Sequence, residues 1–156
     1  MAARPQKAQT MPMPARVLIV EDHLPQRIFL RELVKRLGAK DVVEAENGRV
    51  AMEKLQHRQF DLLLVDLAMP DMDGLQLLGH LKEDRTAIPP VILCSVLPQE
   101  PLSACAAWLG AHYDLPVIGG ISKPVSSEAL INLYASYQAS RAKPDSAAGG
   151  PPSRFG

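Results

Sequence analysis

Polar side chains follow short apolar runs at four places in this chain of 156 residues. Each place lies where an apolar run ends, and the residues found there are Glu21 and Asp22 after RVLIV, Asp66 ending DLLLVD, Ser95 after VILC, and Lys123 after VIGGIS. If the runs are parallel strands of one sheet, their carboxyl ends share one edge. The sequence therefore predicts one polar site built from residues that lie far apart along the chain.

Three carboxylates at one edge of a sheet favour a bound cation. Neighbouring carboxylates repel one another and resist ionisation, whereas Mg²⁺ (or Mn²⁺) accepts carboxylate and phosphate oxygens together. Lys123 would add a positive charge for the same phosphate, and the Ser95 hydroxyl could bind a phosphate oxygen. Asp66 is the candidate nucleophile, because an aspartate can accept a phosphoryl group covalently. These residue types indicate phosphoryl chemistry.

Each of these residues has an ordinary structural explanation when it is taken alone. Glu21 and Asp22 are compatible with a solvated turn, and Asp66 is compatible with a helix N-cap. Ser95 is compatible with a polar strand end, and Lys123 with a surface position. The prediction of a site depends on their occurrence together at successive strand ends.

The composition excludes several classes of partner. Lysine and arginine number 17, as do aspartate and glutamate, so no net charge attracts nucleic acid or an acidic membrane surface. No apolar run approaches the ~18 residues of a membrane helix, and no apolar signal segment is visible, so we expect a cytoplasmic protein. Cys94 and Cys105 are too few for a zinc site and have apolar neighbours, which predicts buried thiols.

The ends of the chain differ from its centre. Residues 1–15 lack periodicity and are predicted to form a disordered N-terminal tail, and residues 141–156 have the composition of a flexible C-terminal tail or linker. Between them, residues 16–140 alternate apolar runs with amphipathic stretches, which predicts an α/β fold with helices on both faces of a parallel sheet. We expect strands over 16–20, 41–45, 61–65, 91–94 and 117–121, and helices over 24–37, 48–58, 74–82, 100–113 and 126–139.

Four motifs resemble the receiver domain of two-component response regulators, the CheY-like family. They are VLIVEDH at 17–23, DLLLVDLAMPDMDGLQLL at 61–78, VILCS at 91–95 and ISKP at 121–124. The stretch VDLAMPDMDG is highly specific, and the resemblance covers about residues 16–139. It implies a doubly wound (βα)5, flavodoxin-like three-layer sandwich with strand order 2-1-3-4-5.

The resemblance also implies a role for each residue of the acidic site. Asp66 would receive a phosphoryl group from a histidine of a sensor histidine kinase or a histidine phosphotransfer protein. Asp22 and Asp66 would ligate Mg²⁺, Glu21 would hold it through water or a hydrogen bond, and the backbone carbonyl of Ala68 would be a further ligand. Lys123 would neutralise the phosphate.

The resemblance further implies a conformational switch. Ser95 would be the switch hydroxyl, Pro124 would follow a peptide bond that the family tends to hold cis, and Gly74 would relax the loop after the third strand. A downstream protein would bind the face formed by helix 4, strand 5 and helix 5, and a homodimer is left open. The chain would be a phosphoacceptor and not an enzyme with a separate substrate.

Two features depart from the family pattern. The family's second switch residue is an aromatic three positions before the lysine, where this chain has Gly120. The segment from Gly110 to Lys123 is also longer than in familiar receivers, and we expect it to extend the fourth helix to about Tyr113. The phrase LPVIGGISKP resembles receivers joined to EAL-type cyclic di-GMP phosphodiesterase domains, in which a glycine likewise replaces the aromatic.

Three alternatives remain at the level of sequence, and the first is that the chain is the receiver part of a longer EAL-type cyclic di-GMP phosphodiesterase. Because Gly120 has no side chain to rotate, the domain could be an adaptor or dimerisation module whose output does not depend on phosphorylation. A phosphatase of the haloacid dehalogenase type also uses a nucleophilic aspartate, but that family has a second aspartate where Ala68 stands. Unchanged partner affinity after phosphorylation would favour the adaptor, and turnover of a phosphomonoester would favour the phosphatase.

Overall fold

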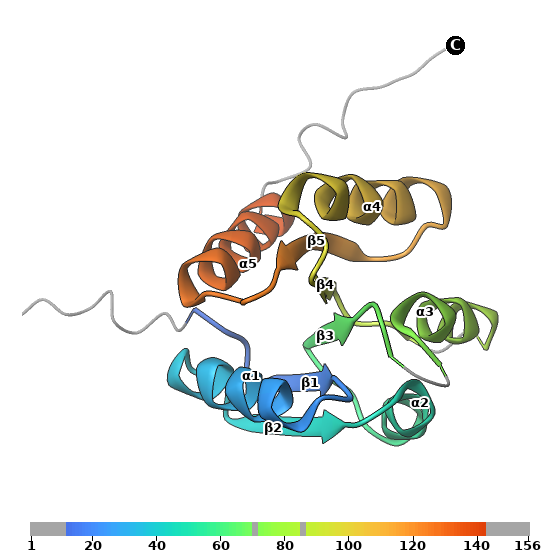
Figure 1. Ribbon diagram of the computed structural model, residues 1–156, viewed down its shortest axis with the longest axis horizontal. Helices are drawn as coiled ribbons and strands as arrows, with labels where there is room; N and C mark the ends of the chain where they lie inside the picture. The colour runs from blue at the N-terminus through green and yellow to red at the C-terminus, as the bar shows by residue number, and fades with distance from the viewer. Residues whose placement is uncertain (1–11, 70–71, 85–86, 143–156) are drawn as a thin grey trace, which may run out of the picture.

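The computed structural model describes residues 12–69, 72–84 and 87–142, and within them strands and helices alternate (Figure 1). Most of each predicted tail, residues 1–11 and 143–156, therefore lies outside the described residues. In chain order the elements are β1 (Arg16–Val20), α1 (Leu24–Arg36), β2 (Asp41–Ala45), α2 (Gly48–His57), β3 (Leu62–Asp66), α3 (Gly74–Glu83), β4 (Val91–Ser95), α4 (Gln99–His112), β5 (Val117–Ser122) and α5 (Ser127–Ala142).

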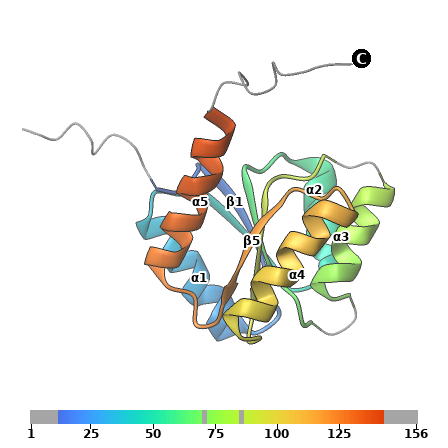
Figure 2. The same ribbon diagram turned by 90° about the horizontal axis from the view of Figure 1, so that it is seen from above.

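All paired strands run parallel, in the order β2-β1-β3-β4-β5. Helices α1 and α5 cover one face of the sheet, and α2, α3 and α4 cover the other (Figure 2). The predicted doubly wound α/β sandwich, its number of strands and its strand order are thus confirmed. Since every strand runs in the same direction, the residues after β1, β3, β4 and β5 meet at one edge.

The continuously apolar strands bury both of their faces. Alternate residues of β3 illustrate this, because Leu63 and Val65 belong to the core beneath α2, α3 and α4, whereas Leu62 and Leu64 belong to the core beneath α1 and α5. None of these four side chains is more than 1% exposed. A strand that is buried on both faces has no polar alternation, which is why VLIV and LLLV read as unbroken apolar runs.

The expected extension of the fourth helix is confirmed. Helix α4 ends at His112, and Tyr113 is its C-cap, with its backbone N–H bonded to the Leu109 carbonyl. Leu102 and Leu109 are buried on the sheet side, whereas Trp108 and Tyr113 are each 48% exposed. The additional residues thus lengthen a packed helix before β5 begins.

Some predicted boundaries were wrong. Met13, placed in the N-terminal tail, is 2% exposed, and its backbone N–H donates to the Leu37 carbonyl at the end of α1. Helix α5 extends two residues past the predicted domain end, to Ala142. Cys94 is buried as expected, but Cys105 is only half-buried because α4 turns it toward the edge of the core. The folded unit therefore begins before residue 16 and continues past residue 140.

Candidate functional site

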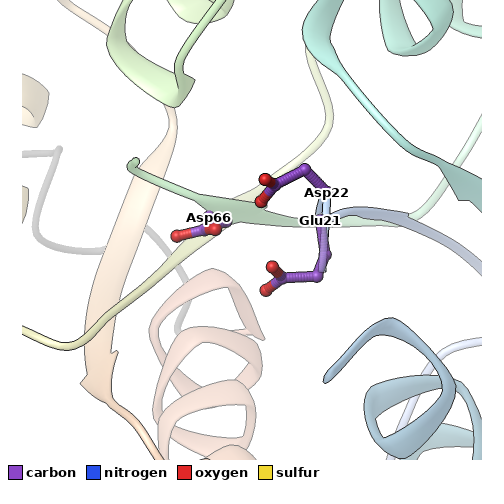
Figure 3. Close-up of side chains that lie close together, drawn as sticks. All are labelled: Glu21, Asp22 and Asp66. Carbon is purple, nitrogen blue, oxygen red and sulfur yellow. The ribbon is translucent and has the colours of Figure 1, made fainter. Parts of the chain in front are cut away.

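The three carboxylates predicted from strand ends do converge. Glu21 and Asp22 follow β1, and Asp66 is the last residue of β3, the strand that pairs with β1. One carboxylate oxygen from each of the three residues forms a group in which all atoms lie within 4.8 Å of one another. Figure 3 shows the side chains of Glu21 and Asp22 turned toward Asp66.

The three carboxylates differ in their exposure to solvent. Glu21 is 1% exposed and Asp66 is 6% exposed, whereas Asp22 lies at the surface. The cluster therefore combines two buried acids with one exposed acid.

Lys123, the first residue after β5, brings the positive charge. Its Nζ lies 2.9 Å from Glu21 Oε1 and 3.4 Å from Asp66 Oδ1. Burial lowers the pKa of Lys123, but the hydrogen bond to Glu21 and the charge of Asp66 outweigh that effect, so its pKa is raised. The lysine is accordingly charged at neutral pH and lies between the two buried acids.

One lysine does not neutralise the site. Burial raises the pKa of the Asp66 carboxyl, and the charge of Glu21 raises it further, to about 6, although Lys123 and the Ala68 N–H lower it. The protein thus holds a carboxylate that ionises only at a cost. A second cation nearby would favour the ionised form and so oppose that shift.

The donor set fits a hard divalent cation. All three side chains are oxygen donors from carboxylates, and within the described residues no histidine or cysteine joins this group. Mg²⁺ prefers oxygen ligands and commonly keeps several waters beside one or two carboxylates. Glu21, Asp22 and Asp66 are therefore suited to hold Mg²⁺.

Backbone groups frame Asp66. The Ala68 N–H donates to Asp66 Oδ1 at 3.2 Å, and Gly74, which opens α3, donates its N–H to the Leu67 carbonyl. A Cβ at Gly74 would lie 2.7 Å from the Asp66 carbonyl oxygen and 2.8 Å from Val65 Cγ1. The predicted importance of Gly74 thus has a steric cause, because α3 starts in contact with the backbone of β3.

Ser95 ends β4 beside the site and is 3% exposed. Its Oγ accepts a hydrogen bond from the Leu97 N–H at 3.1 Å, and its carbonyl accepts one from the Lys123 N–H at 2.7 Å. The hydroxyl is therefore held by the loop between β4 and α4. The Lys123–Pro124 peptide bond is cis, as the resemblance implied.

Gly120 does not lie among the carboxylates. It lies within β5, paired with Leu93 of β4 and covered by α4. A Cβ there would meet Leu102 Cγ at 2.6 Å, and Leu102 is fully buried. The space beside this position is thus filled by a leucine of α4.

Two polar residues beside Gly120 were not identified from the sequence. Gln99, the first residue of α4, donates from Nε2 to the Gly120 carbonyl at 2.7 Å and accepts at Oε1 from the Ser122 N–H at 2.9 Å. Ser122 donates from Oγ to the Leu97 carbonyl at 2.6 Å. The consecutive glycines Gly119 and Gly120 were the available sequence signal for these contacts. Glycine within a strand often marks a position where another segment approaches the backbone closely.

Within the described residues, no helix is both long and apolar enough to cross a membrane.

Comparison with known families matches residues 17–135 to the response regulator receiver domain. The matched region includes every residue of the acidic site.

Individual proteins agree with this match. Over 100 residues the chain is 36% identical to the chemotaxis protein CheY of Bacillus subtilis, covering 64% of this chain and 82% of CheY. It is 36% identical over 87 residues to the sensor protein EvgS of Escherichia coli K12, covering 56% of this chain but only 7% of EvgS. The chain thus spans most of the first relative and a small part of the second.

Solved structures share the fold. The Francisella response regulator 1452 receiver domain superposes with a TM-score of 0.65 at 23% identity, covering 81% of this chain and 99% of that one. The response regulator TrrA of Thermotoga maritima, solved in complex with Mg²⁺ and BeF, has a TM-score of 0.62 at 21% identity, covering 79% and 98%. With its strand order, its acidic site and its sequence match, the chain belongs to the response regulator receiver domain family of two-component signalling.

Proposed function

We propose that Asp66 accepts a phosphoryl group in a Mg²⁺-dependent phosphorelay and that phosphorylation changes the protein contacts of this domain. The observation that carries the proposal is the placement of Asp66 at the base of an acidic site, with the Lys123 ammonium 3.4 Å from its Oδ1. A carboxylate can attack phosphorus, and phosphoryl transfer asks mainly for positioning and charge neutralisation. The site provides both.

The residues around Asp66 have separate roles in this proposal. As the bond from Asp66 to phosphorus forms, the bond from phosphorus to the donor histidine nitrogen breaks, and the imidazole keeps the electron pair. The Lys123 ammonium and the Ala68 N–H already contact Asp66 Oδ1, so they lie close enough to stabilise negative charge on the transferred group. The Ser95 hydroxyl would donate to a phosphoryl oxygen.

Glu21, Asp22 and Asp66 would hold Mg²⁺, with the Ala68 carbonyl as a further ligand. When bound, the metal would supply positive charge that offsets the negative charge of the carboxylates and of the phosphoryl group. Burial and, after it, the charge of Glu21 raise the pKa of Asp66, so a cation at this site would favour the ionised carboxylate, which supports this assignment. The complex of TrrA with Mg²⁺ and BeF offers a precedent within the same fold.

Sensor histidine kinases are the partner class of receiver domains, and in this proposal one of them is the phosphoryl donor. An apolar surface beside the site supports this pairing. Leu24, Ile28 and Phe29 are exposed large hydrophobic residues on α1. Phe29 and Pro124 line a hollow of about 270 Å³ next to the cis peptide bond. Such a surface would bind the apolar face of the donor's helices while its histidine reaches Asp66.

The output surface in this proposal is the face formed by α4, β5 and α5. A groove of about 500 Å³ runs there between the two helices, with Gly119 and Gly120 on its floor. Val117 and Leu133 add apolar lining, and Gln99 adds a polar group. A downstream protein or a second copy of this chain would bind this face after phosphorylation.

The test is intact mass after incubation with acetyl phosphate and Mg²⁺. The wild type should gain one phosphoryl group, and Asp66→Asn should gain none. Asp84→Asn, at the C-cap of α3, is the matched control and should be modified as the wild type is. Removal of Mg²⁺ should abolish the gain. A wild type that stays unmodified, or an Asp66→Asn variant that is modified equally, would contradict the proposal.

An adaptor whose output is independent of phosphorylation is the second candidate, and Gly120 favours it. No side chain can rotate at that position, and Leu102 of α4 fills the adjacent space. If partner binding is equal for the phosphorylated and unphosphorylated protein, the adaptor function replaces the switch. The resemblance of residues 115–124 to receivers joined to EAL-type phosphodiesterases stays a prediction.

A further inference from the structure

A continuous path of hydrogen bonds leads from Ser95 to the edge of the sheet at Gly120. The Leu97 N–H donates to Ser95 Oγ, and the Leu97 carbonyl accepts from Ser122 Oγ. The Ser122 N–H donates to Gln99 Oε1, and Gln99 Nε2 donates to the Gly120 carbonyl. Every link is between 2.6 and 3.1 Å long. The path starts beside Asp66 and ends under α4.

The side chain of Gln99 lies against the outer edge of strand β5. This strand lies at the edge of the sheet, so among the residues that the structure describes no strand neighbours one side of its backbone. The side-chain amide of Gln99 bonds the Gly120 carbonyl and the Ser122 N–H, two groups that a further parallel strand would otherwise bind. Because Gln99 is also the first residue of α4, the helix is tied directly to this edge.

The space that an aromatic side chain would need at position 120 is filled. A Cβ on Gly120 would lie 2.6 Å from Leu102 Cγ and 3.2 Å from both Leu102 methyl carbons. Leu102 is fully buried one helical turn after Gln99 in α4. The contact between α4 and β5 is therefore both apolar, through Leu102, and polar, through Gln99.

We propose that Gln99 is a positioning residue that links Ser95 to strand β5 and helix α4 through Ser122 and Leu97, in place of a rotating aromatic side chain. The inference rests on the proposed phosphorylation of Asp66. When the Ser95 hydroxyl donates to a phosphoryl oxygen, its oxygen moves toward Asp66, and the Leu97 N–H that is bonded to it follows. The Leu97 carbonyl then draws Ser122 and Gln99, so that β5 and the start of α4 shift together.

The experiment compares amide NMR spectra with and without Mg²⁺ and beryllofluoride, which serves as the phosphoryl mimic. Gln99→Met removes all three side-chain hydrogen bonds of Gln99 at similar length, and Ser122→Ala removes only the bond to the Leu97 carbonyl. Ser103→Ala is the control, because it removes the remaining Gln99 contact, which lies within α4 and outside the path. Thermal unfolding of each variant reports any purely structural effect separately.

In the wild type, beryllofluoride should shift amides at Ala68, Leu97, Gly120 and within α4. In Gln99→Met and in Ser122→Ala, the shift at Ala68 should persist, while the shifts at Gly120 and in α4 should fall at least twofold. Ser103→Ala should keep the wild-type pattern. If Gln99 and Ser122 only stabilised the fold, their substitutions would lower the unfolding temperature but leave the beryllofluoride-induced shifts at Gly120 and in α4 unchanged.

Two outcomes would overturn the inference, and they are distinguishable. If Ala68 shifts in all proteins and Gly120 shifts equally in the wild type, Gln99→Met and Ser122→Ala, the path does not transmit the change. Phosphorylation of Asp66 would then stand without this role of Gln99. If no amide near Asp66 shifts in the wild type, the proposed function fails, and the role of Gln99 fails with it.

Discussion

The close contact between β5 and α4 predicts that Gly120→Ala destabilises the fold. The new Cβ would lie 2.6 Å from Leu102 Cγ, a distance that real Cβ contacts essentially never show. Cγ is the branch point of a fully buried side chain and not its flexible end, so relief requires Leu102 to leave its rotamer or α4 to move away from the sheet. Either response disturbs the core.

The expected cost follows from two opposing effects. Overpacking of a well-packed core typically costs about 1 to 3 kcal/mol. Replacing glycine by alanine in a strand interior recovers about 0.5 to 1 kcal/mol of conformational entropy. The net loss should lie between zero and about 2.5 kcal/mol and centre near about 1 kcal/mol, which for a domain of this size lowers the unfolding temperature by roughly 4 °C and by at most roughly 10 °C.

Thermal and urea unfolding followed by circular dichroism measure this loss, and Gly79→Ala is the matched control. Gly79 lies inside α3, and no atom lies within 4 Å of a Cβ built there. Alanine should therefore stabilise α3 by about 0.5 to 1 kcal/mol through its higher helix propensity. Alanine is favoured over glycine by backbone entropy in both elements, so a destabilising effect at Gly120 alone would reflect the contact with Leu102.

A double-mutant cycle identifies Leu102 as the cause. Leu102→Ala should itself cost about 2 to 5 kcal/mol, because it opens a cavity in the core. In that background Gly120→Ala should be neutral or stabilising, since its methyl group enters the vacated space. A Gly120→Ala cost that is the same with leucine or alanine at position 102, or a stabilising effect in the wild type, would refute the steric reasoning.

Three further predictions concern the acidic site. The pKa of Asp66 is raised from 3.8 to about 6, chiefly by burial and then by Glu21, so the native state binds the proton more tightly and stability falls as the pH rises through this range. In urea unfolding without metal, the free energy of unfolding of Asp66→Asn should therefore equal that of the wild type below pH 4 and exceed it by up to about 3 kcal/mol above pH 6. If the two proteins differ by the same amount at both pH values, this reasoning is wrong. Asp22→Asn should weaken Mg²⁺ binding at least about tenfold in calorimetric titration, equivalent to about 1.4 kcal/mol, and unchanged affinity would remove Asp22 from the ligand set. Gly74→Ala should cost about 1 to 3 kcal/mol in stability and slow phosphorylation by acetyl phosphate, because its Cβ would contact the Asp66 carbonyl oxygen at 2.7 Å; a normal rate of modification would show that the loop tolerates the shift.

The convergence of Glu21, Asp22, Asp66 and Lys123 could be predicted from the sequence. Continuous apolar runs identified parallel strands buried on both faces, and in such a sheet the residues after each strand share one edge. The convergence of these four residues is thus a consequence of strand direction and residue type. The structure adds the distances, the burial of Glu21 and the raised pKa of Asp66.

The burial of Met13 could not be predicted in the same way. Residues before β1 have no periodicity, so their composition indicated a tail. The structure shows that Met13 docks against the end of α1 through its side chain and its backbone N–H. Such docking depends on where α1 ends in space, which a local pattern does not specify.

The amino-acid sequence by itself determined the α/β class, the strand positions and the acidic edge, because these follow from local apolar runs and from the residues that end them. Only the tertiary structure decided that Leu102 fills the space beside Gly120 and that Gln99 bonds the edge of β5. Those contacts depend on the distance and rotation of α4 relative to the sheet. Helical periodicity identifies which face of a helix is apolar, but the meeting of individual atoms is decided by how the two surfaces fit together.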